Sequence, residues 1–198
     1  MARRSATAER SSDARGRRLG RAFFDRPTVS VARALLGAEL RVRGADGDRV
    51  VRLVETEAYV ADDPASHAYR GPTQRNRSMF HLPGTLYVYR IHQVVCANLV
   101  TRQGEAVLLR AGSPRRPVEG NPSGPGRLCR FLGIRLEDDG TDAVRSPRVR
   151  VRPRAGPSGP VWVGPRVGVS RAGRRRLRFA LRDDPYVSRP RPRVPGRR

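Results

Sequence analysis

The sequence predicts a single domain of mixed α and β structure in which short strands outnumber helices. The chain has 198 residues, which is enough for one hydrophobic core. Apolar and β-branched runs recur along it and are separated by short turn sequences, a pattern typical of neighbouring strands joined by hairpins. Helical signals are few and short.

The first expected elements are a helix and a hairpin. Pro27 and Ser30 mark the start of the helix, and Gly37 ends it after a short apolar stripe. Residues 38–43 and 49–59 follow as two strands, because an Ala-Asp-Gly-Asp turn separates two β-branched runs.

The rest of the chain continues this pattern of strands, loops and one further helix. In chain order we expect a loop at 60–74, a short helical turn at 75–80, strands at 86–91, 94–100 and 106–111, an irregular stretch at 112–125, a helix at 128–132, an irregular stretch rich in Arg and Pro at 147–160, and strands at 161–163, 166–170 and 177–181.

The two ends of the chain differ in composition from the middle. Residues 1–22 are expected to form a disordered basic arm, 23–188 the folded domain, and 189–198 a disordered tail of Pro and Arg. The alternative for the arm is an organelle-targeting peptide, but Glu9, Asp13 and the lack of an amphipathic stripe disfavour it.

The charge of the chain indicates a polyanionic partner. The net charge is +23 and every basic residue is arginine; without residues 1–21 and 182–198, 28 arginines still face 14 acidic residues. A surface this basic attracts nucleic acid, although a genome biased toward arginine is the alternative explanation. The absence of lysine excludes a Schiff-base enzyme and a Walker-type nucleotide hydrolase.

Cysteine and histidine usage predicts neither a disulfide framework nor a metal site. The two cysteines, Cys96 and Cys129, have no paired spacing. His92 and Cys96 are four residues apart, but in a strand this spacing does not converge on one ion. No stretch is long or apolar enough for a membrane span or a secretion signal, so we expect a soluble intracellular protein.

The strongest functional signal lies between residues 53 and 98. On the strand that ends at Tyr59, alternate residues share a face, so Glu55, Glu57 and Tyr59 project together. Two carboxylates beside an aromatic ring are hard to explain by packing. They are followed by an Asp/His-containing loop, an Arg-rich turn and an aromatic strand, which places the expected chemistry in this part of the chain.

Motifs from about Phe24 to Ser188 closely resemble those of the alkyladenine (3-methylpurine) DNA glycosylase family. In chain order these are Val54-Glu-Thr-Glu-Ala-Tyr59, Ala65-Ser-His67, Arg75-Asn-Arg77, Met79-Phe80, Pro83-Gly-Thr-Leu-Tyr-Val-Tyr89, Cys96, Asn98, Val107-Leu-Leu-Arg-Ala111, Gly124-Pro125, Leu128-Cys129 and Arg166-Val-Gly-Val169. The resemblance implies a single α+β domain with a curved, mainly antiparallel sheet and a few flanking helices.

The resemblance also implies a reaction: hydrolytic removal of alkylated or deaminated purines from double-stranded DNA, the first step of base excision repair. Glu57 matches the general base that activates water, and Arg110 and the backbone carbonyl of Val167 match groups that help to hold that water. Without lysine, no imine and no strand-cutting step are expected, so the enzyme would be monofunctional. No metal or organic cofactor is implied.

Further positions match groups that hold the base or the DNA. The base pocket is expected from Tyr59, His67 and Tyr89, which can stack on a flipped base, and from Asn98, which can screen its exocyclic groups. Arg75 and Arg77 are expected to contact phosphates, and His92 stands where relatives have a wedge tyrosine.

We expect the protein to act as a monomer, in the cytoplasm on nucleoid DNA.

Other residues have simpler expected roles. Glu55 is expected to be a structural carboxylate paired with arginine, Tyr87 a core residue and His81 an exposed loop residue. Asn98 taken alone could equally be a turn or sheet hydrogen-bonding residue.

The sequence also departs from the family pattern. Gln93 and Gln74 replace a common glycine and a proline, and residues 112–123 stand in place of a longer segment that contains a helix. These departures, with His92, leave an alternative open: a catalytically impaired relative that binds DNA or RNA through its arginines. A hydrolase of small nucleosides is a third possibility, which the basic middle disfavours.

Overall fold

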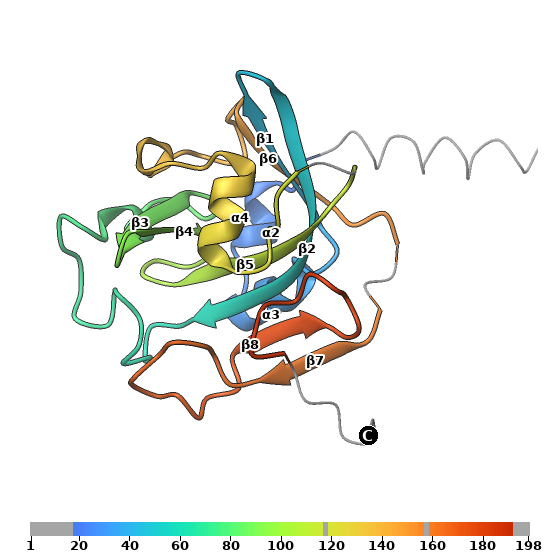
Figure 1. The fold of residues 1–198 in the computed structure, drawn as a ribbon. Helices are drawn as coiled ribbons and strands as arrows, with labels where there is room; N and C mark the ends of the chain where they lie inside the picture. The colour runs from blue at the N-terminus through green and yellow to red at the C-terminus, as the bar shows by residue number, and fades with distance from the viewer. Residues whose placement is uncertain (1–17, 117–118, 157–158, 192–198) are drawn as a thin grey trace, which may run out of the picture.

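The computed structural model describes residues 18–116, 119–156 and 159–191. The strands among these residues form one eight-stranded antiparallel sheet (Figure 1). The main path of the sheet is β3-β4-β5-β2-β1-β6, while β8 pairs with β2 and β7 with β8. The curved, mainly antiparallel sheet and the mixed α/β class are therefore confirmed. The strands are β1 Glu39–Gly44, β2 Gly47–Tyr59, β3 Leu86–Ile91, β4 Val94–Val100, β5 Ala106–Pro114, β6 Val149–Arg152, β7 Val161–Gly164 and β8 Arg178–Leu181.

Strand β2 organises the sheet because it has three partners. It pairs with β5 along one edge; along the other it pairs first with β1 and then, at Glu55–Glu57, with β8. Its register against β5 shifts on both sides of Glu55, an irregularity that bends a strand and increases its twist. Glu55 and Glu57, which lie at and just after this irregularity, are fully buried.

Helices lie on both faces of this sheet. Helix α3 packs on β2 and β5, whereas α4 packs on β4 and β5, and in Figure 1 α4 lies in front of the strands and α3 behind them. The Thr56 hydroxyl donates to the carbonyl of Ala32 at 2.9 Å, so Thr56 faces α3 and its neighbours Glu55 and Glu57 face the opposite side. The helices are α2 Arg21–Phe24, α3 Thr28–Ala34, η1 Arg77–Phe80, α4 Pro125–Leu132 and η2 Leu136–Asp138.

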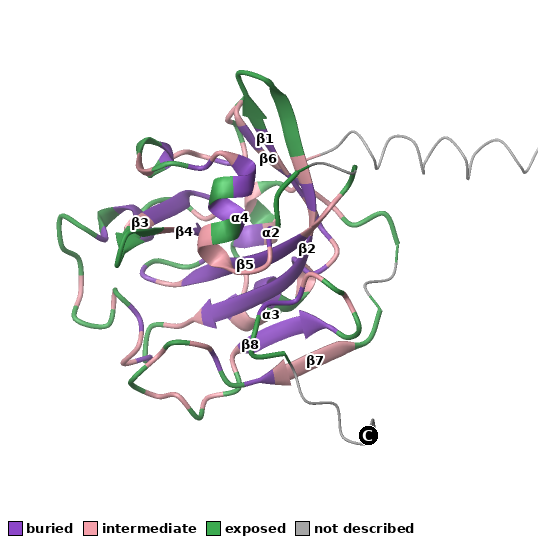
Figure 2. Ribbon diagram, in the orientation of Figure 1, coloured by how far each residue is buried: buried purple, intermediate pink, exposed green. Residues whose placement is uncertain are grey.

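The hydrophobic core fills both sides of the central strands. Figure 2 shows β5, β8 and the second half of β2 mostly buried, while the β1–β2 turn and the start of β2 are exposed. Phe24, Leu35, Leu53, Leu109 and Leu128 are inaccessible or nearly so, which joins helices and sheet into one core. Such close packing provides the rigid support that a preorganised site needs.

Most expected elements are confirmed, and two expectations are wrong. The strands at 86–91 and 94–100 have the expected bounds, and the helix before Gly133 begins at Pro125. Residues 149–152, expected to be irregular, form β6, because Val149 and Val151 alternate with arginines and pair with β1. Residues 166–170, expected to be a strand, form a loop in which Gly168 has φ +76°.

The N-terminal end of the described chain is attached to the domain. The amide of Leu19 donates to the carbonyl of Val151 at 2.8 Å, and Arg21 pairs with Asp142 at 2.7 Å. Most of the expected arm (1–17) and most of the expected tail (192–198) lie outside the described residues, so those boundaries stay predictions.

Among the residues described, no helix is both long and apolar enough to cross a membrane.

Candidate active site

A buried carboxylate, Glu57, lies where β2 faces β5. Its Oε1 accepts the backbone N–H of Val167 at 2.9 Å and lies 3.3 Å from Nη1 of Arg110. Its Oε2 accepts the hydroxyl of Tyr59 at 3.1 Å. Three of the residues expected to act together, Glu57, Arg110 and Val167, are therefore adjacent. The observed contact is made by the N–H of Val167, whereas the expectation concerned its carbonyl.

The surroundings of Glu57 favour its protonated form on balance. Burial raises the pKa of Glu57, while Arg110, the Val167 N–H and the Tyr59 hydroxyl lower it. The same burial raises the pKa of Tyr59 above its ordinary value, so this hydroxyl remains a donor. A carboxylate with a raised pKa and fixed donors has the properties of a general base that works near neutral pH.

The second carboxylate of β2, Glu55, has a structural environment. It is fully buried and lies 3.1 Å from Nε of Arg110 and 2.6 Å from Nε of Arg178. The N–H and hydroxyl of Ser188 also donate to it, at 2.7 and 3.0 Å. The expected pairing of Glu55 with arginine is confirmed, and it is satisfied by two cations at once.

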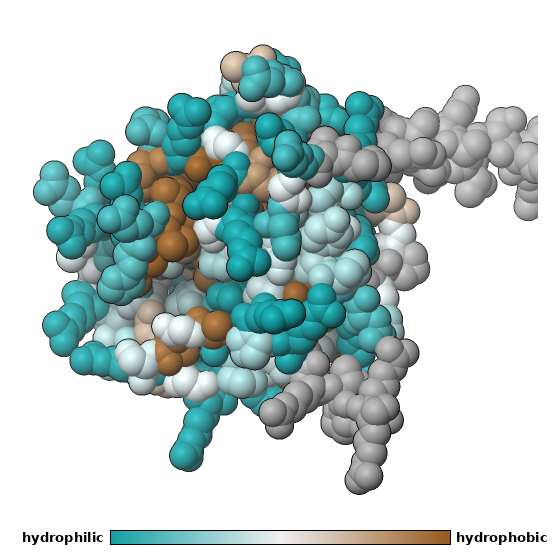
Figure 3. Space-filling view, viewed as in Figure 1, coloured by the Kyte–Doolittle hydropathy of each residue, from teal (hydrophilic) through white to brown (hydrophobic). Residues whose placement is uncertain are grey.

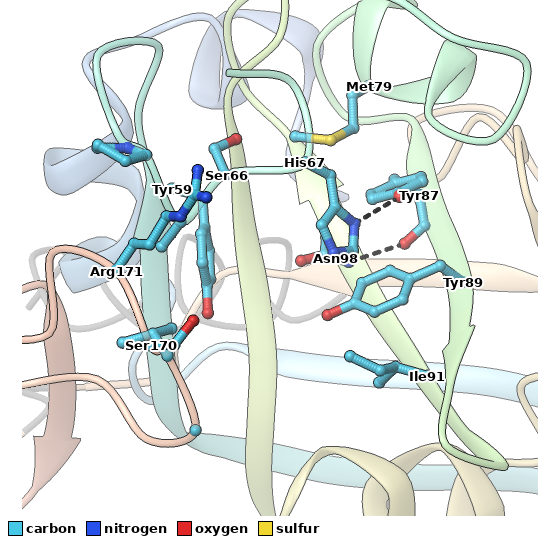
Figure 4. A pocket seen from close by; sticks show the side chains of 14 residues that line it. Tyr59, Ser66, His67, Met79, Tyr87, Tyr89, Ile91, Asn98, Ser170 and Arg171 are labelled. Atoms are coloured by element: carbon cyan, nitrogen blue, oxygen red, sulfur yellow. Dashed lines mark hydrogen bonds between the residues drawn. The ribbon is translucent and has the colours of Figure 1, made fainter. Parts of the chain in front are cut away.

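A cavity of about 330 Å³ opens beside Tyr59, and its lining also includes the aromatic rings of His67, Tyr87 and Tyr89 (Figure 4). Tyr59 forms one wall, and His67 and Tyr89 form the wall opposite. The rings of His67 and Tyr89 meet edge to face with centroids 4.5 Å apart, and Tyr87 stacks on Tyr89 at 5.3 Å. Asn98 also lines the cavity, so the structure brings together all four expected pocket residues.

Polar atoms at the cavity have defined partners. Nδ1 of His67 lies 2.9 Å from the hydroxyl of Tyr87, which leaves Nε2 as the second polar atom of the ring. Although His67 lies at the open edge of the cavity, partial burial of its ring lowers its pKa and favours neutral imidazole. The amide nitrogen of Asn98 donates to the Tyr87 carbonyl at 3.1 Å, and this bond fixes the side chain in the cavity wall.

A buried ion pair supports the Tyr59 wall from behind. The guanidinium of Arg166 lies 4.5 Å from the ring centroid of Tyr59 and donates to the carbonyl of Ala58 at 3.1 Å. It also pairs with Asp63, and neither side chain is accessible to solvent. Arg166 therefore ties the loop that carries Val167 to the loop that follows Tyr59.

Comparison of the sequence with known proteins identifies the family of the chain. The model of the family described as Methylpurine-DNA glycosylase (MPG) matches residues 22–185. The chain belongs to the methylpurine-DNA glycosylase family. A relative from Rhizobium etli is 41% identical over 186 residues, covering 86% of this chain and 88% of its own. Relatives from Anaeromyxobacter dehalogenans and Nitrosospira multiformis are 46% and 42% identical, covering 88% and 84% of this chain and 87% and 92% of theirs; all three bear the name "Putative 3-methyladenine DNA glycosylase".

Within this methylpurine-DNA glycosylase fold, the short connection 112–123 still delivers α4 to the sheet. The amide of Gly112 donates to the carbonyl of Pro122, and Ala111 bridges to Ser123. Helix α4 then begins at Pro125 and packs on β4 and β5. The strands that carry Glu57 and Arg110 are therefore covered by α4.

The expected DNA-contacting residues lie outside the cavity, on the surface around it. Arg75 and Arg77 are exposed, and Asn76 between them donates to the carbonyl of His67 at 2.8 Å, which fixes this turn beside the cavity. His92 is exposed at the tip of the β3–β4 hairpin with φ 42°, and Gln93 has φ 68°. These left-handed angles are those at which glycine is favoured.

Sequence reasoning missed several residues of the site. Tyr87 is buried, as expected for a core residue, but it also lines the cavity, and Arg171 lies at the cavity edge beside Tyr59 (Figure 4). Tyr87 and Tyr89 alternate on one strand, so their shared face was a usable signal. Arg166 and Asp63 are 103 residues apart, and no local pattern joins them.

A second groove, of about 790 Å³, lies between the β3–β4 hairpin, the start of α4 and residues 185–191. No acidic residue is among its described lining residues, which include Arg110, Arg127, Arg130, Arg189 and Arg191. Figure 3 shows this side of the molecule, where hydrophilic side chains surround a smaller hydrophobic area near β4 and α4. We call this the arginine groove.

Among the described residues, no group of three or more His, Cys, Asp or Glu is placed to hold a metal ion.

Proposed function

We propose that the protein is a monofunctional DNA glycosylase that hydrolyses the N-glycosyl bond of alkylated or deaminated purines, of the 3-methyladenine type, in duplex DNA. Membership of the methylpurine-DNA glycosylase family supports a glycosylase that acts on DNA. The observation that carries the proposal is the buried carboxylate of Glu57, which accepts a hydrogen bond from Tyr59, one of the aromatic residues that line the cavity.

The cavity suits a flat base taken out of the helical stack. A purine between Tyr59 and the His67–Tyr89 wall would have an aromatic face on each side, which replaces the stacking it loses in the duplex. The Asn98 amide would meet the edge of the base. It is the group that would discriminate purines by their exocyclic substituents.

Hydrolysis would proceed through a sugar that carries positive charge. Glu57 would remove a proton from the attacking water and stabilise the oxocarbenium-like state electrostatically. Arg110 would lower the pKa of Glu57 and orient its carboxylate, and the backbone of Val167 would complete the water site. Because the chain has no lysine, no side-chain amine forms an imine with the sugar, and the product is an abasic site.

DNA would be held by arginines on either side of the hairpin. Arg75 and Arg77 would contact phosphates beside the cavity, and the arginine groove would follow the backbone further along. His92 would enter the space that the flipped base leaves. A monomer offers all of these groups, and the substrate places the protein on nucleoid DNA in the cytoplasm.

Base release tests the proposal. Labelled duplexes carrying a single hypoxanthine or ethenoadenine, together with alkylated DNA as a source of 3-methyladenine, are incubated with wild type and with Glu57→Gln. We expect release by wild type alone, with binding retained by the variant. No release from any substrate, with salt-sensitive DNA binding intact, would identify the impaired DNA- or RNA-binding relative instead.

A further inference from the structure

We propose that Ser188 is a positioning residue that aligns Arg110 with Glu57, which makes the C-terminal segment 185–191 a working part of the active site. This inference rests on the proposed function, because it assigns a role within that reaction. No motif pointed to Ser188, which is nevertheless buried with its hydroxyl inside the charged cluster.

The carboxylate of Glu55 is shared by three parts of the chain. It accepts hydrogen bonds from Arg110 on β5, from Arg178 on β8 and from both the N–H and the hydroxyl of Ser188. The relative exposure of these four residues is between 0% and 5%, so no solvent competes for these bonds. Glu55 is thereby the common acceptor that brings β5, β8 and the C-terminal segment together.

The guanidinium of Arg110 has three contacts that fix its orientation. Its Nε donates to Glu55 at 3.1 Å, its Nη2 donates to the Ser188 hydroxyl at 3.2 Å, and its Nη1 lies 3.3 Å from Glu57. A guanidinium is planar with donors at fixed angles, so two contacts define its plane and thus the direction of the third. The Ser188 hydroxyl is one of those two contacts.

The segment 185–191 has contacts that hold it in place without the Ser188 hydroxyl. Nη2 of Arg178 donates to the carbonyls of Ser188 and Pro190, both at 3.0 Å. Asp184, four residues before Ser188, pairs with Arg52 at 2.5 Å, and Val187 is buried. Ser188→Ala therefore removes one contact of Arg110 and leaves the backbone of the segment in place.

The consequence for Glu57 has a definite sign. Arg110 lowers the pKa of Glu57, so a less well aligned guanidinium lets that pKa rise. The other ionisable groups around Glu57 are Glu55 and Tyr59 on β2 and Cys96 on β4, with Arg178 of β8 behind Glu55, and Ser188→Ala removes none of them. At a pH near neutral, a smaller fraction of the base would then be ionised.

Single-turnover release of hypoxanthine from duplex DNA, measured against pH with the full chain, tests the proposal. We expect Ser188→Ala to slow release about tenfold at neutral pH, to move the acidic limb of the profile to higher pH and to leave DNA affinity unchanged. Ser188→Thr, which keeps a hydroxyl, is expected to keep the wild-type profile. Asp184→Asn is the matched control, because it loosens the same segment without touching Arg110.

A second readout does not require turnover. The carboxyl of Glu57 is titrated by ¹³C NMR in wild type and in Ser188→Ala, with Glu57→Gln to assign the signal. A higher pKa in Ser188→Ala alone supports the proposal. An unchanged pKa of Glu57 in Ser188→Ala, or an equal change in Asp184→Asn, overturns the proposal and leaves Ser188 as a structural anchor of the segment. If the pKa is shifted in Ser188→Ala but wild type releases no base, only the proposed function is contradicted.

Discussion

Glu57 is the residue on which the account depends, and its burial has an energetic cost. The folded state raises the pKa of Glu57 above its ordinary value of 4.5, chiefly by burial. The folded state thus holds the proton more tightly than the unfolded state does. The ionised carboxylate therefore destabilises the fold increasingly as the pH rises from 4.5 through the folded pKa, a cost typical of catalytic groups.

Replacing this carboxylate should therefore stabilise the protein. We expect Glu57→Gln to raise the thermal midpoint at pH 7 by roughly 2–4 °C, because an uncharged amide incurs a smaller desolvation cost. The gain should disappear near pH 4, where wild-type Glu57 is protonated as well. Calorimetry across this pH range measures both effects, and a lower midpoint for the variant at pH 7 would contradict this reading of the site.

At the level of the element, strands carry most of what sequence can predict. The strands at 86–91 and 94–100 and the carboxylate face of β2 follow from alternation and turn residues, which act locally. The bend at Glu55 depends on the pairing with Ala111 of β5, and the partners Arg178 and Ser188 of Glu55 lie more than 100 residues away in the chain. β6 was missed because prolines and arginines surround its two buried valines.

The loops at the cavity depend on one such distant pairing. Asp63→Asn leaves the buried Arg166 without its carboxylate, so we expect it to lower the free energy of unfolding by about 3–5 kcal/mol. Chemical denaturation measures this loss. Asp62→Asn is the matched control: Asp62 is exposed and pairs with Arg175 at the surface, and its replacement should leave stability unchanged. Equal effects of the two variants would show that the buried pair has no special role.

The β3–β4 hairpin makes a separate prediction about base flipping. If His92 fills the space of the flipped base, His92→Ala should slow release from duplex DNA and His92→Tyr, with a larger ring, should speed it. Release from single-stranded DNA, where no stack has to be opened, serves as the control and should change little. The same change on both substrates would place His92 in a different role.

The whole molecule is basic, but its arginines are distributed unevenly. The arginine groove has no acidic lining residue among those described, whereas the cavity between the β1–β2 turn and α4 has Glu39, Asp46, Asp48 and Glu119 beside its arginines. Phosphates are therefore attracted to the first and much less to the second. The net charge of +23 predicted a nucleic-acid partner, but only the fold shows where the excess is concentrated.

This difference can be measured as a salt dependence. Replacing Arg189 and Arg191, which line the arginine groove but not the cavity with acidic residues, by Gln should weaken duplex binding for all sequences and reduce the slope of log affinity against log salt by about 2. The control pair, Arg49→Gln with Arg116→Gln, lies only on the mixed-charge cavity and should leave the slope unchanged. Identical slopes for both pairs would rule out a specific backbone path.

The proposed role of Glu57 as the base of a DNA glycosylase is tested most directly by one measurement. This is the single-turnover rate of hypoxanthine release as a function of pH. For wild type the rate should rise with pH as Glu57 ionises. For Glu57→Gln it should fall by at least about 100-fold and lose this rise. A variant that keeps the rate and the pH dependence of wild type would contradict the account.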